Sequence, residues 1–404
     1  MANLAASNEA VILSAVRTPM GRFQGSLGSL TAPQLGAAVV REAVARAGAD
    51  PAQIDEVIMG DVVTAGIGQA PARQAALFGG LPDSTPATTV NKVCGSGLKA
   101  CMFAAQAIRA GDARVIVAGG MESMSQTPFL LRARTGLRYG HNELVDSLLH
   151  DGLWDPFEDW AMGMAAEYIA ERYEVTREAM DRFSLASHQK AIEAIDTGLF
   201  KEQIAPVEVP GKGGTKSVVS EDETPRRDTS LEKLASLKPA FKPDGRVTAG
   251  NAPGLNDGAA ALVIASREAA QAIGARPLAR VLAYTQAAVP PKELFIAPAR
   301  ALPKLLQKLG WRFADVDLIE LNEAFAAQVL ADGYAMTEEG WDWNWDKVNV
   351  HGGAIALGHP IGASGARILT TLLYALRERG LRRGIASLCL GGGEAVAMAV
   401  ELEP

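Results

Sequence analysis

The stretch CGSGLKA at residues 94–100 begins a predicted helix, and a glycine, a buried strand at 114–118 and two more glycines follow it. GASGARI at 362–368 begins the same series at nearly the same spacing, with its strand at 385–390. Any two α/β units share this general order, but here the two helix starts also match locally. We therefore predict that one α/β unit occurs twice in this chain.

The rest of the chain also alternates short apolar stretches with helical ones, which is typical of α/β proteins. Several of the predicted helices end at a glycine, the usual residue after a helix C-terminus. Further strands are predicted at 10–16, 55–63 and 316–321, and helices at 32–48, 98–110, 299–310 and 366–379.

The segment 121–250 between the two units has a different character. Helical stretches are predicted around 163–173 and 178–197, and the segment then becomes rich in glycine, lysine and charge at 211–246. We expect it to run over the surface without a third core, as lids and binding loops do. For the stretch 248–266 that follows, we predict a glycine-rich turn and then a buried helix or strand.

Composition limits the function. The chain has 404 residues, 48% of them apolar, a net charge of −7 and three cysteines. The negative charge argues against a nucleic-acid partner, although a few basic residues could still bind an anionic small molecule. Three cysteines are too few for a disulfide framework. No signal peptide is expected at the N-terminus and no apolar run could span a bilayer, so we expect a cytoplasmic protein without a membrane partner.

Cys94 is the first candidate for chemistry, because it opens a predicted helix among small residues. The partial positive charge of a helix N-terminus favours a thiolate, so we expect a lowered thiol pKa. The flanking glycines would let a substrate carbonyl approach the backbone. The alternative is a buried structural cysteine.

Two histidines, His351 and His359, lie in the glycine-rich stretch VHGGAIALGHPIG at 350–362. This composition suits a loop whose backbone amides line a site, and histidine is the usual base for a cysteine nucleophile. Either histidine could instead be a satisfied structural side chain.

Two further candidates follow buried strands. Cys389 ends the strand at 385–390 and precedes three glycines, and Asn322 follows the strand at 316–321. Active sites of α/β sheets lie at such strand ends. An asparagine there can hold a water or donate to an oxyanion. The alternatives are a core cysteine and a helix N-cap.

Taken together, these stretches resemble the thiolases over nearly the whole chain and in the right order. The motifs are VCGSGLKA (93–100), GGMESMS (119–125), LKPAF (237–241), TAGNAPGLNDGAA (248–260), NEAFAAQ (322–328), GHPIGASGAR (358–367) and CLGGGEAVAM (389–398). The resemblance implies a thiolase-like α/β fold: two duplicated halves in α-β-α-β-α layers with an inserted loop domain over coenzyme A. It implies an N-terminal half of 1–120 with 251–275, a loop domain of 121–250 and a C-terminal half of 276–404.

The resemblance also implies roles for the candidate residues. Cys94 would be the acylated nucleophile, His359 its base and Cys389 the second acid/base. Asn322 would polarise the thioester oxygen through a water, and the amide of Gly391 would join that of Cys94 in an oxyanion hole. His359 is favoured over His351 as the base, because its GHP context belongs to the motif.

Coenzyme A is expected only as substrate and product, with no tightly bound cofactor and no metal. The spacing of Cys94, His359 and Cys389 lacks the usual zinc-site pattern. By resemblance, coenzyme A would contact Leu153, Met162, Arg226, Leu234, Phe241, Ala249 and Phe325. The family also implies a homodimer or homotetramer.

The favoured reaction is the reversible condensation of two acetyl-CoA to acetoacetyl-CoA through acyl-Cys94, in a ping-pong scheme. The alternative is a broader 3-ketoacyl-CoA thiolase of fatty-acid or aromatic degradation, because Ala161, Pro253 and the stretch Phe295–Pro298 depart from the short-chain pattern. A thiolase-like lipid carrier without catalysis would need a damaged triad, but Cys94, His359 and Cys389 are all present. A decarboxylating ketoacyl synthase would lack the second cysteine of the CLGGG motif, and the presence of Cys389 contradicts that alternative.

Overall fold

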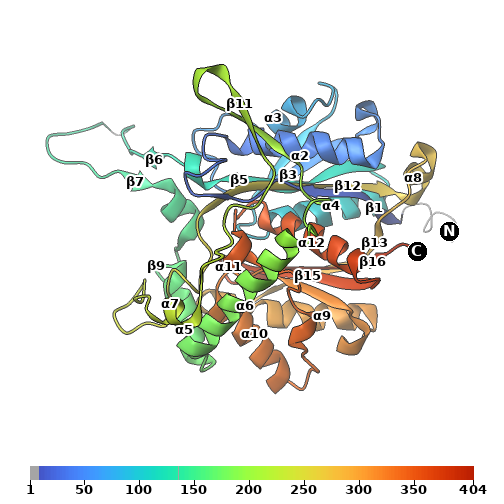
Figure 1. Ribbon diagram of the computed structural model, residues 1–404. Helices are drawn as coiled ribbons and strands as arrows, with labels where there is room; N and C mark the ends of the chain where they lie inside the picture. The colour runs from blue at the N-terminus through green and yellow to red at the C-terminus, as the bar shows by residue number, and fades with distance from the viewer. Residues whose placement is uncertain (1–8, 135) are drawn as a thin grey trace.

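The computed structural model describes residues 9–134 and 136–404. The expectation that no signal peptide precedes the first strand concerns residues 1–8 and so lies outside the described residues. In Figure 1 the N-terminal half lies above the C-terminal half, and the inserted segment runs along one side of both. Within the described residues, no helix is both long and apolar enough to cross a membrane.

The two halves have the same strand order. In the N-terminal half β3 and β5 pair in parallel, while β5–β12 and β12–β1 are antiparallel. In the C-terminal half β14 and β15 pair in parallel, while β15–β16 and β16–β13 are antiparallel. The predicted duplication is therefore confirmed by topology. The strands are β1 (Ala10–Arg17), β3 (Glu56–Gly60), β4 (Ala87–Val90), β5 (Val115–Ser123), β12 (Asn256–Ser266), β13 (Ala279–Ala288), β14 (Leu318–Leu321), β15 (Arg383–Leu390) and β16 (Glu394–Leu402).

The two sheets are joined along one short seam. β1 pairs with β13 at Val11↔Arg280 and Ile12↔Ala279, which links all these strands into one path. The parallel strand β4 lies at the N-terminal edge beside β3, and β2 (Gly21–Arg22) pairs with β12. The stretch 248–266, for which helix and strand were both open, is a strand from Asn256 onward.

Helices complete five layers, as expected. The helices α4 and α12 lie between the two sheets, and their apolar side chains form one core with strands of both halves (Figure 1). The outer face of one sheet is covered by α2 and α3, and that of the other by α9 and α10. Their bounds are α2 (Ala32–Ala47), α3 (Pro71–Phe78), α4 (Ser96–Ala110), α8 (Arg267–Ile273), α9 (Pro298–Leu309), α10 (Ala326–Glu338), α11 (Ala354–Leu357) and α12 (Ser364–Glu378).

The starts of α4 and α12 meet backbone to backbone. A Cβ on Gly97 would lie 2.9 Å from the amide nitrogen of Ala366, and one on Gly365 would lie 2.4 Å from the amide nitrogen of Leu98. Only glycine fits at such distances. The glycines of both motifs therefore serve the contact between the two halves.

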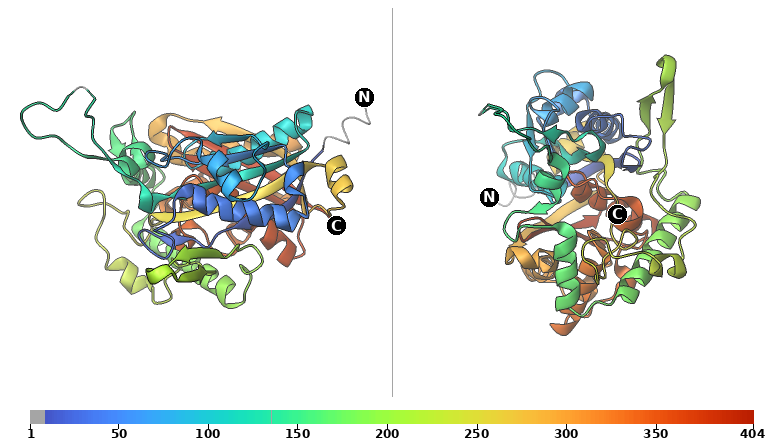
Figure 2. Two further views of the ribbon diagram at one scale, coloured as in Figure 1. Left: turned by 90° about the horizontal axis from the view of Figure 1, so that it is seen from above. Right: turned by 90° about the vertical axis from the view of Figure 1, so that its left-hand side faces the viewer.

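The inserted segment corrects one expectation. It has no large core of its own, but α5 (Met162–Arg172) and part of α6 (Arg177–Asp196) pack into the core beneath the C-terminal sheet. Two other parts of the segment do extend outward: the stretch around β6 and β7 and the hairpin of β10 and β11 project from the body (Figure 2). The smaller elements are β6 (Phe129–Leu130), β7 (Val145–Asp146), β8 (Trp154–Asp155), β9 (Trp160–Ala161), β10 (Val207–Pro210), β11 (Lys216–Val219) and α7 (Leu231–Ala235).

Candidate active site

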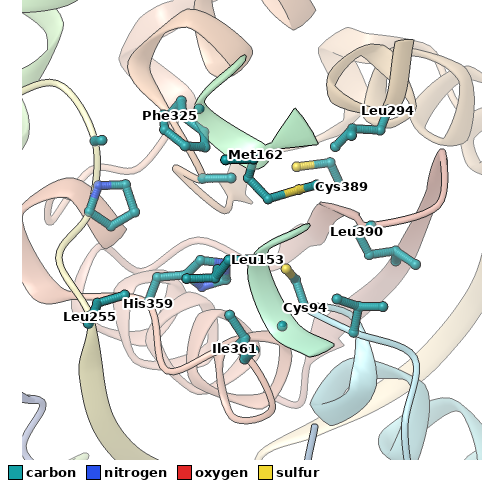
Figure 3. Close-up of a pocket in the computed structure, with 18 of the residues that line it drawn as sticks. Cys94, Leu153, Met162, Leu255, Leu294, Phe325, His359, Ile361, Cys389 and Leu390 are labelled. Carbon is teal, nitrogen blue, oxygen red and sulfur yellow. The ribbon is translucent and has the colours of Figure 1, made fainter. Parts of the chain in front are cut away.

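One apolar cavity at the boundary of the two halves collects most of the candidate residues. Cys94, His359 and Cys389 all line it, and Figure 3 shows their side chains turned toward one another. Cys94 comes from the start of α4, His359 from the turn before α12 and Cys389 from the end of β15. The fold therefore brings residues from both duplicated units to one place.

Cys94 stands on a strained turn. Val93, the residue before it, has a φ of 47°, in the left-handed region that β-branched residues rarely adopt. Such a conformation costs on the order of 1–3 kcal/mol and persists only where neighbouring contacts hold it. The Ser96 hydroxyl supplies one, because it donates to the Val93 carbonyl at 2.6 Å and accepts from the Lys92 amide at 2.8 Å. The thiol is thereby exposed to the cavity.

The resting state of Cys94 is the neutral thiol. Burial raises its pKa to about 12, and Glu122 adds to the rise, although the amides of Cys94 and Gly391 oppose it. The expected lowering by the helix N-terminus was therefore wrong, because desolvation outweighs it. The two amides nevertheless point at the place where a charge on this residue would form.

His359 is held as a neutral base. The Ser364 hydroxyl donates to the Pro360 carbonyl at 2.9 Å, so it accepts from His359 Nδ1, which lies 2.6 Å away. This leaves Nε2 as the unprotonated nitrogen, and Nε2 has no hydrogen-bond partner among the residues that the structure describes. Burial and then the charge of Arg367 lower the pKa of His359 to about 3. The imidazole can therefore accept a proton at Nε2.

Cys389 is a second neutral thiol. It is 1% exposed, and burial, followed by the neighbouring Cys94, raises its pKa well above the ordinary value. The chain then turns sharply, because Gly392 and Gly393 have φ of 85° and 88°. This turn keeps the amide of Gly391 beside Cys94.

Asn322 is buried and is not one of the residues that line the cavity. Its backbone amide continues the sheet to the Ser387 carbonyl at 3.0 Å, and its side-chain oxygen accepts from Arg367 Nη2 at 3.3 Å. The side-chain nitrogen is buried and has no hydrogen-bond partner among the described residues. His351 also lies elsewhere: its ring meets Phe200 edge-on, with centroids 6.1 Å apart.

Four of the seven residues expected around coenzyme A line the same cavity, namely Leu153, Met162, Phe241 and Phe325. Phe325 is central, because its ring packs edge-on against Phe241 at 6.5 Å and Phe295 at 5.3 Å between centroids. Three residues that depart from the short-chain pattern, Ala161, Pro253 and Phe295, also line this cavity.

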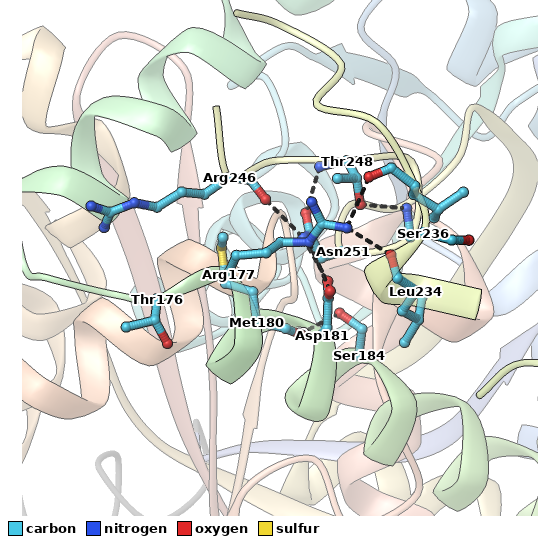
Figure 4. Close-up of polar contacts among 12 residues, drawn as sticks. Thr176, Arg177, Met180, Asp181, Ser184, Leu234, Ser236, Arg246, Thr248 and Asn251 are labelled. Atoms are coloured by element: carbon cyan, nitrogen blue, oxygen red, sulfur yellow. Dashed lines mark hydrogen bonds and ion pairs between the residues drawn. The ribbon is translucent and has the colours of Figure 1, made fainter. Parts of the chain in front are cut away.

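The other three, Arg226, Leu234 and Ala249, lie outside the cavity wall. Arg226 and Ala249 are exposed, and Leu234 is buried. The loop that carries Leu234 and Ala249 is anchored to α6, since Arg177 donates to the Leu234 carbonyl at 2.6 Å and Asn251 donates to Asp181 at 3.0 Å (Figure 4). This anchoring holds the loop beside the cavity mouth.

Three buried polar residues near the cavity were not predicted. Glu122 accepts the amides of Val62 and Gly362 at 3.1 and 3.0 Å and so ties the His359 turn to the N-terminal half. Ser364 and Arg367 act on His359 and Asn322 as described above. The sequence offers one signal for these three residues: Arg367 is a charged residue within the otherwise apolar stretch of α12. Among the described residues, no three His, Cys, Asp or Glu side chains are grouped as a metal site.

Comparison with known proteins agrees with this geometry. The model of the thiolase N-terminal domain matches residues 10–268, and that of the thiolase C-terminal domain matches residues 275–402. The chain is 55% identical to an acetyl-CoA acetyltransferase of Pseudomonas aeruginosa over 96% of its length and 98% of that protein. It is 48% identical to a probable acetyl-CoA acyltransferase of Staphylococcus epidermidis, over 96% and 98%. The solved acetyl-CoA acetyltransferase of Bacillus anthracis superposes with a TM-score of 0.95 at 46% identity, covering 99% of this chain and 100% of that one. The chain belongs to the thiolase family.

Proposed function

We propose that this acyltransferase is an acetyl-CoA C-acetyltransferase that joins two acetyl-CoA into acetoacetyl-CoA and coenzyme A, reversibly and through an acetyl group on Cys94. The observation that carries the proposal is the meeting of two neutral thiols and one neutral imidazole in a single apolar cavity. The high identity to proteins named acetyl-CoA acetyltransferase supports the choice of substrate.

The protons can be followed through both half-reactions. His359 Nε2 takes the proton of Cys94, whose thiolate attacks the thioester carbonyl. The departing coenzyme A thiolate takes the proton of Cys389, which rests as a thiol. The Cys389 thiolate then removes an α-proton from the second acetyl-CoA, and the resulting enolate attacks acetyl-Cys94. Cys94 leaves and recovers its proton from His359.

Two oxyanion sites would serve these steps. The amides of Cys94 and Gly391, which both face the Cys94 sulfur, would stabilise the oxygen of acetyl-Cys94. Asn322, through a water, and His359 would stabilise the enolate oxygen. Each has a buried side-chain nitrogen without a hydrogen-bond partner in the described part of the chain. No step needs a metal or a bound cofactor.

Coenzyme A would enter along the inserted segment 121–250, which we propose as the coenzyme A domain between halves 1–120 with 251–275 and 276–404. Its pantetheine would lie along Leu153, Met162, Phe241 and Phe325. Its nucleotide end would extend past Leu234 and Ala249 toward Arg226, whose exposed side chain is free to meet a phosphate.

The test is direct acylation. After incubation with acetyl-CoA, peptide mass mapping should find one acetyl group, on Cys94, and Cys94→Ala should carry none. Acetyl on Cys389 with Cys94 bare would reverse the two roles. Absence of any acetylated cysteine in active protein would rule out the ping-pong scheme.

The second candidate is a broader 3-ketoacyl-CoA thiolase. It is favoured by the aromatic wall of Phe295 and Phe325, which is apolar enough for a longer acyl chain, and by the identity to a protein named as an acyltransferase. Thiolysis rates with 3-ketoacyl-CoA of four to twelve carbons separate the two. A steep loss beyond four carbons supports the acetyltransferase, and a flat series supports the alternative.

We further propose a homodimer or homotetramer in the cytoplasm, working in fatty acid metabolism. Leu77, Phe78 and Phe103 are exposed large apolar side chains on α3 and α4, near the edge strand β4, and a second copy could cover them. The chemistry needs Cys94 and Cys389 as thiols, which a reducing compartment maintains. Light scattering would give the number of subunits.

A further inference from the structure

Arg367, on α12, is among the largest side chains that the fold buries completely, with 0% exposure. Its Nη2 donates to the side-chain oxygen of Asn322 at 3.3 Å, and its Nη1 lies 3.9 Å from Glu320 Oε2. Within residues 9–134 and 136–404, its Nε and Nη1 have no hydrogen-bond partner. A buried guanidinium with so few partners is unfavourable for stability, so its position calls for a functional reason.

The contact with Asn322 decides which way the amide of that residue faces. A guanidinium can only donate, so it must meet the oxygen of the amide and never the nitrogen. The nitrogen of Asn322 then points away from Arg367, and it is buried without a hydrogen-bond partner among the residues described. An asparagine free to rotate by 180° would present its oxygen instead, and an oxygen repels an oxyanion.

We propose that Arg367 is a positioning residue of the thiolase reaction, which fixes Asn322 with its N–H donors turned toward the enolate-stabilising water. The inference rests on the proposed function, because it gives Arg367 its role through the oxyanion site assigned there. Losing one such donor in an enzyme costs about 10²–10³ in rate.

The charge of Arg367 has a second effect, on His359. It lowers the pKa of His359 beyond what burial does, which holds the imidazole in the proton-accepting form. The groups that face His359 otherwise carry no charge at rest: the Ser364 hydroxyl, the Asn256 amide and the thiols of Cys94 and Cys389.

The charged groups near Arg367 do not cancel the effect of its positive charge on His359. Burial raises the pKa of Glu320 to about 8, so this carboxyl is mostly neutral at pH 7. Burial also raises the pKa of Glu323, although its hydrogen bonds from Ser187 at 2.7 Å and Asn349 at 3.0 Å oppose this rise. Arg17 is paired with Asp222 at 2.6 Å.

The experiment compares Arg367→Lys with Arg367→Gln. Lysine keeps the charge but loses the planar fork, whereas glutamine loses both. The readouts are kcat and KM for acetoacetyl-CoA thiolysis, and the pH profile of Cys94 alkylation by iodoacetamide in the free enzyme. We expect Arg367→Lys to lower kcat by about 10²-fold, with KM nearly unchanged, as for a lost oxyanion donor. Its alkylation profile should match that of the parent.

Arg367→Gln should lower kcat as much and should also move the acid limb of alkylation to higher pH, because removing a nearby positive charge raises the pKa of His359. The control is Lys99→Gln, at the matching position of α4, which should change neither readout. If Arg367→Gln fails to fold, the double variant Glu320→Gln/Arg367→Gln is used in its place, because it removes the buried guanidinium and the buried carboxyl together.

A double-mutant cycle with Asn322→Ala separates positioning from a general structural role. If Arg367 acts through Asn322, the double variant Asn322→Ala/Arg367→Lys is no slower than Asn322→Ala alone. Losses that multiply, or a kcat of Arg367→Lys equal to the parent, overturn the inference. Either of these outcomes can be distinguished from a failure of the proposed function, because in that case the parent protein itself would not form acetyl-Cys94.

Discussion

The helix starts of α4 and α12 occupy equivalent places in the two halves, and their sequences align as CGSGLKA and GASGARI. In both, a serine hydroxyl donates to a carbonyl of the preceding turn: Ser96 to Val93 at 2.6 Å, and Ser364 to Pro360 at 2.9 Å. What each serine accepts is different. Ser96 accepts a backbone amide, from Lys92, whereas Ser364 accepts the ring of His359.

Two other aligned pairs diverge further. Cys94 aligns with Gly362, whose amide is bound by Glu122, and the partly exposed Lys99 aligns with the fully buried Arg367. Under the proposed mechanism, one half supplies the nucleophile at its helix start, and the other supplies the groups that would move and control protons. The duplicated unit would then serve as the scaffold, and the chemistry would come from the positions at which the copies differ.

The largest effect is expected from Cys389, which belongs to the proton-handling half. Cys389→Ala should lower the condensation rate by about 10²–10⁴-fold, the usual contribution of a general acid or base. Exchange of α-protons into solvent should be lost as well. Acetyl labelling of Cys94 should persist but form more slowly, because the nucleophile and its base are intact while the departing coenzyme A thiolate loses the proton of Cys389.

Mass mapping of the labelled protein and proton NMR of acetyl-CoA in D₂O measure the two steps separately. A folded Cys389→Ala protein that cannot be acetylated would show that the halves do not divide the reaction as described.

A smaller effect is expected at the two serines. Ser364→Ala leaves His359 Nδ1 without its acceptor, which costs about 1–3 kcal/mol for a buried donor and slows acylation by roughly 5–150-fold. Without Ser364, the proton of His359 can lie on either ring nitrogen, and this adds to the loss of rate. Ser96→Ala is the matched variant: it should lower thermal stability by loosening the Val93 turn but leave the pH profile of acylation in place.

Rapid-mixing measurements of acetylation against pH, together with melting curves, check the pair. Equal shifts of the pH profile in both variants would mean that the two helix starts are not specialised.

The smallest effect is expected outside the duplicated core. Arg226→Ala should raise KM for acetyl-CoA several-fold with kcat unchanged, because an exposed ionic contact is worth about 1 kcal/mol or less and acts equally on ground and transition states. The effect should shrink at high salt. The variant should also discriminate less between coenzyme A and dephospho-coenzyme A substrates, and unchanged KM with unchanged discrimination would place the nucleotide elsewhere.

Much of the fold could be predicted, because local signals carried it. Apolar runs and glycines at helix ends marked the duplicated strands and helices, and β3 was merely shorter than expected. The packing of α5 into the C-terminal core could not be predicted, since its partners in α10 are more than a hundred residues away. The same limit applies to the candidate site.

Cys94, His359 and Cys389 could be proposed from the sequence because each lies in a distinctive glycine-rich motif, and the fold places all three in one cavity. The pKa of Cys94 was predicted in the wrong direction, because the sequence shows the helix start but not the burial that outweighs it. Ser364 and Arg367 were missed for a related reason: a hydroxyl or a guanidinium gains its role from a partner, and the partner of Arg367, Asn322, is distant in sequence.

The place of β1 in the sheet has a consequence for synthesis on the ribosome. β1 is among the first segments to emerge, yet both of its neighbours in the sheet, β12 and β13, are made more than two hundred residues later. At about 5–20 residues per second, the strand waits roughly 10–50 s before its hydrogen-bonding partners exist. Throughout that time its eight apolar-rich residues present two open edges. The nascent first half is therefore a natural client for chaperones that shield unpaired strands, and nascent chains that stop before residue 256 should be more prone to aggregate than those that include β12.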